Sequence, residues 1–149
     1  SDHAYVDAPF GVFSYLYHDA PNLVFIAGGI GITPFMSMLR DLSEKGSARQ
    51  VLLIWGNRHE RDIAFRAELK DLASRMPSLR VVHVLSRQED WPGERGYVNA
   101  NMLRTYMDGM RDPRVYVCGP PAMLKSVLRA LAELGIPRSR IHYEQFALR

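Results

Sequence analysis

The sequence contains very little cysteine, no long hydrophobic run and no block of like charges. Its single cysteine, Cys118, excludes an internal disulfide and a four-cysteine iron–sulfur cluster built by this chain alone. A reducing, cytoplasmic location is therefore expected. The longest nearly apolar stretch, residues 23–36, contains glycines, a threonine and a proline, and it is shorter than the roughly 20 apolar residues that span a bilayer.

The distribution of charge and of histidine excludes two further classes of function. The net charge is only +3 over 149 residues, and the basic residues, which are mostly arginines, are scattered along the chain. Nucleic-acid-binding surfaces cluster such residues, so no nucleic-acid partner is predicted. The histidines have no metal-ligand spacing with the cysteine or with a carboxylate pair, so no metal site is predicted.

What the sequence does contain is a regular alternation of apolar runs and helical patterns. The runs are short and do not alternate with polar residues, which is typical of strands buried on both faces of a parallel sheet. They lie at 23–27, 51–55, 81–85, 115–118 and, more weakly, 141–146. Between them, apolar residues recur at helical spacing, and Asn99 is a candidate helix N-cap. The alternation predicts a doubly wound α/β domain over 21–149, preceded by an entry segment over 1–20.

The stretch "GGIGITP", residues 28–34, follows the first predicted strand directly. Gly28, Gly29 and Gly31 can adopt positive φ and leave room for a ligand at the backbone. Thr33 is expected to cap the next helix, and Pro34 to be its first helical residue, where a missing N–H costs nothing. Such a helix start is an anion site suited to a pyrophosphate. A tight strand–helix corner without a ligand is the alternative interpretation.

Five motifs, in order, make the chain recognisable. They are "GGIGITP", "WGNR", "LSR…RGYV", "VCGPPAM" and "YEQF". Over about residues 9–146 this series resembles the NAD(P)H-binding domain of the ferredoxin–NADP reductase family. The resemblance implies a Rossmann-like sheet of five parallel strands in the order 3-2-1-4-5, with helices on both faces. It also implies that the glycine turn lies beside "CGPP" at the carboxyl edge of the sheet.

The resemblance implies half of a flavoenzyme. In the family, a hydride passes from NADPH or NADH to FAD in a separate domain of the same parent protein, and electrons leave singly for an acceptor such as ferric iron, haem or oxygen. "PFG" at 9–11 resembles the junction with that flavin domain. Phe35 and the short tail after Phe146 favour the ferric reductase and NADPH oxidase branch, whose members add a membrane haem domain. The alternatives are an NADH-specific domain of a soluble oxygenase reductase or flavodoxin reductase, and a non-catalytic nucleotide-sensing module.

The same resemblance assigns the catalytic residues. Cys118 corresponds to the cysteine beside the nicotinamide carbon that gives up the hydride, and Glu144 and Phe146 correspond to the family's terminal carboxylate and aromatic residue. Ordinary core packing is the alternative for Cys118 and Phe146. The resemblance also adds three cofactor-binding residues of "CGPPAM", namely Gly119, Pro120 and Met123. Arg58 is expected either to contact the pyrophosphate or to be a solvated loop arginine.

The end of the third predicted strand bears on the choice between NADPH and NADH. It reads "LSR", with Ser86 and Arg87, and Arg95 and Tyr97 follow in "RGYV". NADPH-using members of the family carry a basic residue and a tyrosine there, and arginine suits charge-assisted bonds to a phosphate. These four residues therefore favour NADPH, although the same motifs also occur in members that use NADH.

Overall fold

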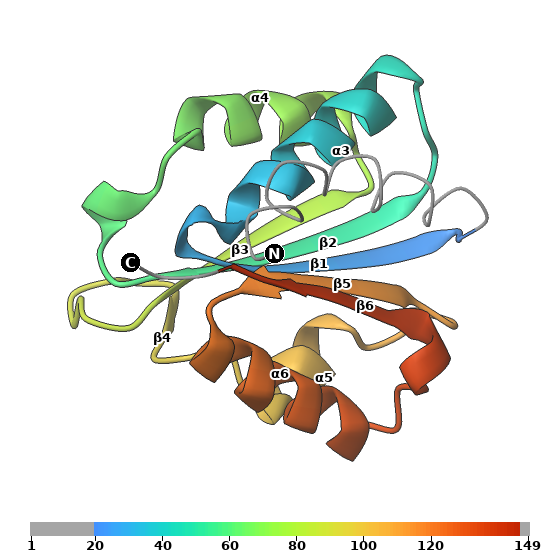
Figure 1. Ribbon diagram of the computed structural model, residues 1–149. Helices are drawn as coiled ribbons and strands as arrows, with labels where there is room; N and C mark the ends of the chain where they lie inside the picture. Colours follow the sequence, from blue (N-terminus) through green and yellow to red (C-terminus); the bar gives the residue numbers. More distant parts are fainter. Residues whose placement is uncertain (1–19, 147–149) are drawn as a thin grey trace.

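A six-stranded parallel sheet forms the centre of the domain (Figure 1). The computed structural model describes residues 20–146, so the predicted entry segment lies outside the described residues except for Ala20. The strands are β1 (Asn22–Gly28), β2 (Gln50–Asn57), β3 (Leu79–Leu85), β4 (Glu94–Arg95), β5 (Arg114–Gly119) and β6 (Ile141–Gln145). Their spatial order is β4-β3-β2-β1-β5-β6, and every neighbouring pair is parallel.

The predicted order of the five main strands is confirmed, but the predicted number is wrong. The five predicted strands correspond to β1, β2, β3, β5 and β6, whose order in the sheet is 3-2-1-4-5 as expected. The sixth strand, β4, pairs Glu94 with Val84 and Arg95 with Leu85 at the edge of the sheet. Because the two residues of β4 are polar, they produce no apolar run in the sequence. Only their pairing with β3 identifies them as a strand.

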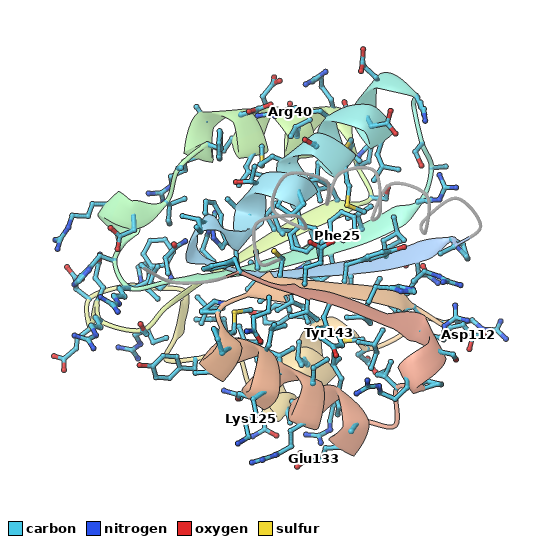
Figure 2. All side chains as sticks on the ribbon, viewed as in Figure 1. Phe25, Arg40, Asp112, Lys125, Glu133 and Tyr143 are labelled. Atoms are coloured by element: carbon cyan, nitrogen blue, oxygen red, sulfur yellow. The ribbon has the colours of Figure 1, made fainter. Side chains whose placement is uncertain are left out.

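Helices cover both faces of the sheet, as predicted. On one face lie α3 (Thr33–Glu44) and α4 (Arg66–Arg75), and on the other lie α5 (Ala100–Tyr106) and α6 (Pro121–Glu133) (Figure 1). Successive residues of a central strand point into opposite cores: Phe25 packs on the α3 side and Ile26 on the α6 side. The sticks of Figure 2 fill the space on both sides of the sheet. Burial on both faces explains why β1 reads as an uninterrupted apolar run.

Several local contacts hold the carboxyl edge of the sheet in place. The Trp55 indole N–H donates to the Gly29 carbonyl at 2.9 Å, which ties the end of β2 to the glycine turn. Phe25 stacks on Phe35 with ring centroids 4.9 Å apart, so the two rings pack α3 against β1. The predicted N-cap is confirmed, because Asn99 Oδ1 accepts a hydrogen bond from the Met102 N–H at 2.9 Å.

Between residues 20 and 146, none of the helices combines the length and the apolar character that crossing a membrane requires.

Candidate functional site

The glycine turn and the end of β5 meet where the chain leaves the sheet in opposite directions. From β1 the chain continues into α3 on one face, and from the neighbouring β5 it continues into α6 on the other. Such a switch point leaves a crevice outside the carboxyl ends of the two strands. A Cβ built on Gly31 would overlap the Cys118 carbonyl oxygen and lie 3.2 Å from the Phe146 ring. The predicted juxtaposition of the turn and "CGPP" is therefore confirmed.

The three glycines of the turn serve different purposes. All three can adopt positive φ, but among them only Gly29 does so, with φ of 53°. Gly28 is extended, with φ −119°, and a Cβ there would overlap the Met123 sulfur. Gly31 must be glycine because the backbone of β5 comes too close for a side chain, whereas the neighbour of Gly28 is the flexible side chain of Met123.

The start of α3 also differs from its prediction. A short 3₁₀ turn, η1 (Gly29–Ile32), runs directly into the helix, so Ile32 and not Thr33 is the N-cap. The Thr33 hydroxyl does not accept from a backbone N–H; it donates to the Ile30 carbonyl at 3.1 Å. Pro34 is the second residue of α3, one position later than predicted, and its missing N–H still costs no helical hydrogen bond. No side chain of the described residues caps this helix start; the Thr33 N–H donates to the Ile30 carbonyl, and Gly29 and Ile30 are the exposed residues of the turn.

The three residues assigned to catalysis lie together at this edge. Cys118 and Glu144 are register partners on β5 and β6, and the Phe146 N–H continues the ladder by donating to the Gly119 carbonyl at 3.3 Å. Cys118 is 5 % exposed, and burial, with the nearby Glu144 carboxylate, raises the pKa of its thiol to about 12. Cys118 is therefore a neutral thiol at physiological pH. Phe146 is buried in the core on the α3 side.

Glu144 is the polar member of this group. Its Oε2 atom is buried and has no hydrogen-bond partner among residues 20–146. Burial raises the pKa of Glu144 to about 7, so an appreciable fraction of this carboxyl is protonated near neutrality. A buried, unpartnered carboxyl next to a thiol is the kind of group that a bound ligand or a docked domain would satisfy.

Met123 fills the space between the ends of β1 and β5 on the α6 side. A Cβ built on Gly119 would lie 2.6 Å from its sulfur, and the same sulfur occupies the space beside Gly28. Pro120 is the N-cap of α6, and Pro121 follows it as the first helical residue. The cofactor-binding residues predicted from "CGPPAM" thus lie next to the glycine turn, with Met123 as packing between the two strand ends.

A pocket of about 660 Å³ opens at the carboxyl end of β3. Its lining consists of Leu85, Ser86, Arg87, Gln88, Glu89, Asp90, Arg95 and Gly96. The structure therefore brings Ser86, Arg87 and Arg95 together as predicted, and β4 is the element that carries Arg95 there. Tyr97, just beyond the pocket, is 73 % exposed. A pocket of this size can hold part of a nucleotide.

Two acidic residues of the pocket were missed by the sequence interpretation. Glu89 and Asp90 line it, and the Arg95 guanidinium donates to the Glu89 carbonyl at 2.8 Å. The available signal was the loop "RQEDWPGERG", in which charges of both signs alternate with turn residues. The pocket is therefore close to neutral in charge, whereas Ser86 and the arginines alone predict a basic one.

Arg58 lies beside Arg87, at the ends of neighbouring strands. The Arg87 N–H donates to the Arg58 carbonyl at 2.9 Å, which continues the β2–β3 ladder beyond the strands. Both side chains are exposed. Guanidinium groups in this arrangement are well suited to a phosphate. The carboxyl edge thus combines a closely packed glycine-rich turn, exposed arginines and a nucleotide-sized pocket, which fits a dinucleotide.

A parallel sheet with this switch point and this edge defines the class of nucleotide-binding α/β domains. Comparison with known proteins narrows the class: the family model "Oxidoreductase NAD-binding domain" matches residues 25–129. The chain belongs to this family, as the nucleotide-binding domain of the ferredoxin–NADP reductase type.

Curated relatives support this assignment over nearly the whole chain. Ferredoxin–NADP reductase B of Sorangium cellulosum is 40 % identical over 135 residues, which are 85 % of this chain and 54 % of that protein. NADH-cytochrome b5 reductase 1 of Candida glabrata is 33 % identical over 140 residues, 91 % of this chain and 49 % of that protein. The chain thus spans about half the length of these relatives.

A solved structure shows the same fold. The flavohemoglobin of Malassezia yamatoensis, determined with bound FAD and heme, superposes with a TM-score of 0.79 at 27 % identity. The match covers 90 % of this chain and 34 % of that one.

Proposed function

We propose that this domain binds NADPH and presents its nicotinamide to FAD held in another domain of the same parent protein. The dinucleotide would supply the hydride and the FAD would accept it, so that electrons could leave singly for an acceptor. The observation that carries the proposal is the close packing of Gly31 on the Cys118 carbonyl. It sets a glycine of the turn against the backbone of Cys118 at the switch point, where a dinucleotide binds in this fold class.

Each part of the carboxyl edge has a role in this proposal. The glycine turn and Arg58 hold the pyrophosphate, and the pocket at the end of β3 receives the adenosine end. Cys118, a neutral thiol at physiological pH, contacts the nicotinamide. Its contribution is to position the ring, since hydride transfer needs the reacting atoms about 3–3.5 Å apart. Glu144, half-protonated near neutrality, is the carboxyl facing that position.

The preference for NADPH rests on Ser86, Arg87 and Arg95. All three line the pocket, and Arg87 is exposed and free to reach a 2′-phosphate. A charge-assisted hydrogen bond from arginine to phosphate is stronger than a neutral one, so each contributes to discrimination.

A specific observation favours a second candidate, an NADH-specific domain. Glu89 and Asp90 share the pocket with the arginines, and Arg95 is already bonded to the Glu89 carbonyl. Carboxylates repel a 2′-phosphate and accept hydrogen bonds from free ribose hydroxyls. The NADPH and NADH proposals therefore differ in whether the attraction of Arg87 for a 2′-phosphate is stronger than the repulsion from Glu89 and Asp90.

The parent protein, in our proposal, is a flavoprotein reductase whose FAD domain precedes this one. Residues 1–20 are then the connection between the two domains, and residues 21–149 the nucleotide-binding domain. The two curated relatives described above are reductases named for a cytochrome and for ferredoxin, and they give no support to the ferric reductase and NADPH oxidase branch. A haem protein or an iron–sulfur protein in the cytoplasm is accordingly the proposed acceptor.

The proposal is tested by titrating the isolated chain with NADPH and NADH, and then by adding it to a preparation of its FAD domain. We expect weak nucleotide binding, no retention of FAD and no NAD(P)H oxidation by the isolated chain. Flavin reduction should occur only when the FAD domain is present. Nucleotide binding without flavin reduction in the presence of the FAD domain would instead identify a nucleotide-sensing module. A purified chain that is yellow with tightly bound FAD would contradict the proposed division of domains.

A further inference from the structure

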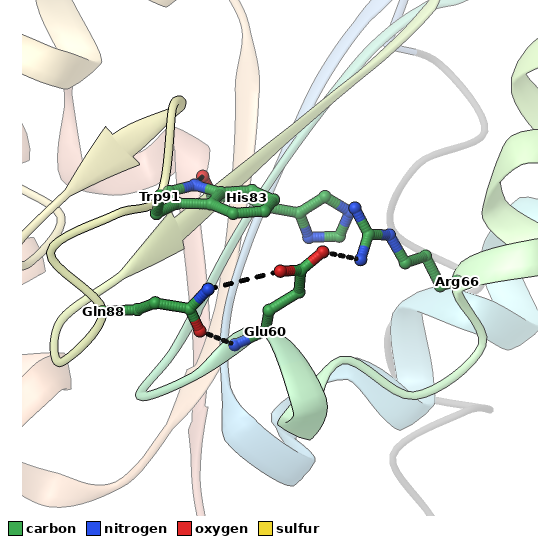
Figure 3. A network of polar contacts seen from close by, with 5 residues as sticks. All are labelled: Glu60, Arg66, His83, Gln88 and Trp91. Carbon is green, nitrogen blue, oxygen red and sulfur yellow. Dashed lines mark hydrogen bonds and ion pairs between the residues drawn. The ribbon is translucent and has the colours of Figure 1, made fainter.

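Residues 86–91 form a loop that makes most of the pocket wall. A residue of the segment after β2 holds this loop at one point. This residue is Glu60, in the short turn η2 (Glu60–Asp62) (Figure 3). Its backbone N–H donates to Gln88 Oε1 at 2.8 Å, and Gln88 Nε2 donates to Glu60 Oε1 at 3.2 Å. Two hydrogen bonds between the same pair fix both the position and the orientation of the Gln88 amide.

The loop is held at a second point by Trp91. The indole N–H of Trp91 donates to the His83 backbone carbonyl at 3.3 Å, and the Arg66 guanidinium lies 5.6 Å from the ring centroid (Figure 3). Gly93 makes this possible, because a Cβ there would lie 2.7 Å from Trp91 Nε1. The indole is thus enclosed between β3, the start of α4 and its own loop.

One carboxylate connects the two points. Glu60 accepts from Gln88 through Oε1 and from Arg66 Nη1 through Oε2 at 2.5 Å, and Arg66 in turn covers Trp91. Glu89 and Asp90 lie between the held residues and line the pocket. Exposed ion pairs add little to overall stability. A network that orders a binding loop in advance acts instead on affinity, because it removes part of the entropy cost of binding.

We propose that Glu60 is a positioning residue for nucleotide binding: it holds residues 86–91 in the shape that receives the adenosine end of the dinucleotide. Glu60 lies outside the pocket lining formed by the described residues, so it acts through Gln88 and through Arg66. This inference rests on the proposed function, since it takes the pocket to be part of the nucleotide site.

Three variants and a matched control test the inference in the full chain. Glu60→Ala removes the carboxylate, and with it the side-chain contacts to Gln88 Nε2 and to Arg66, while the backbone N–H bond to Gln88 stays and the pocket lining is unchanged. Gln88→Glu places a second carboxylate against Glu60, and Glu60→Gln combined with Gln88→Glu restores one carboxylate and one amide. The control, Glu68→Gln, breaks an exposed two-bond ion pair with Arg40 that joins α4 to α3, with distances of 2.7 and 2.8 Å.

The probe is ADP-ribose, which contains the adenosine and pyrophosphate parts common to NADH and NADPH, so the result does not depend on the 2′-phosphate. We expect Glu60→Ala and Gln88→Glu to weaken its binding about 5- to 10-fold, and the double variant to recover most of the loss. The double variant keeps the extra carboxylate in the pocket, so its recovery separates loop positioning from a change in pocket charge. Glu68→Gln should stay within about twofold of the wild type.

Tryptophan fluorescence provides a second readout, since the chain has only two tryptophans. Trp55 is buried, whereas Trp91 is half-buried in the loop. Glu60→Ala should shift the emission to the red because Trp91 becomes more exposed, and Glu68→Gln should not.

The outcomes separate this inference from the function on which it rests. Failure of the wild type to bind ADP-ribose would overturn the proposed function and the inference with it. Wild-type binding that is unchanged in Glu60→Ala would overturn the inference alone. So would an equal loss in Glu68→Gln, because the effect would then be general destabilisation.

Discussion

Replacing Gly31 by alanine tests the contact on which the whole site depends. The new Cβ would overlap the Cys118 carbonyl oxygen and lie 2.8 Å from the carbonyl carbon. Both atoms belong to the backbone of β5, which is hydrogen-bonded on both sides, to β1 and to β6. A flexible side chain would move aside, but this backbone cannot move without disturbing two strand ladders. The turn must therefore shift away from β5.

The expected cost follows from this geometry. Inserting a methyl group where no space exists costs about 1–3 kcal/mol. For a domain of this size, that lowers Tm by roughly 3–10 °C. The displaced turn also loses its alignment with the pyrophosphate. Loss of about one charge-assisted hydrogen bond from the turn to a phosphate weakens nucleotide binding about tenfold or more.

Two other glycines at the same edge serve as controls. Gly56, at the end of β2, has its nearest atoms at 3.9 and 4.0 Å, so Gly56→Ala should be tolerated within about 0.5 kcal/mol. Gly29 has no atom within 4 Å of a built Cβ but has φ of 53°, so Gly29→Ala should cost about 1 kcal/mol of backbone strain without displacing β5. The measurements are thermal unfolding and NADPH titration of the three variants. If Gly31→Ala matched Gly56→Ala in both, the close approach of the turn to β5 would not be what requires the glycine.

Three further predictions concern individual side chains. Cys118→Ala, in the parent protein with its flavin domain, should slow single-turnover hydride transfer about 10- to 100-fold while nucleotide affinity changes less; equal rates would leave the thiol a packing residue. Because burial raises the pKa of Glu144 from 4.5 to about 7, the folded protein holds a proton that the unfolded chain releases, so stability should fall as pH rises from 4.5 to 7. Glu144→Gln should therefore raise Tm at about pH 8 and leave it unchanged at about pH 4, and identical differences at both would show that Glu144 does not titrate this way. Arg87→Ala should weaken NADPH binding roughly 10- to 100-fold and hardly affect NADH, with a smaller NADPH preference at high salt; equal losses would mean that Arg87 does not contact the 2′-phosphate.

Local sequence patterns are enough to predict the five main strands and the helices between them. Strands buried on both faces of a parallel sheet must be apolar throughout, so β1 and β5 are visible as uninterrupted runs. The helices between them carry apolar residues at helical spacing because one face of each helix packs against the sheet. The Asn99 cap depends only on a neighbour three residues away. These features are local, and a local pattern is enough to predict them.

The contacts between distant segments are visible only in the folded structure. Gly31 must be glycine because Cys118, far away in the sequence, approaches it, and no local pattern states which glycine has such a neighbour. The same holds for β4, two polar residues that become a strand by pairing with β3. It also holds for Glu89 and Asp90, which share a pocket with Arg95 because that pairing brings the loop back on itself. Side-chain identity sets the local conformation, but the charge and shape of the site come from segments that meet only in the folded chain.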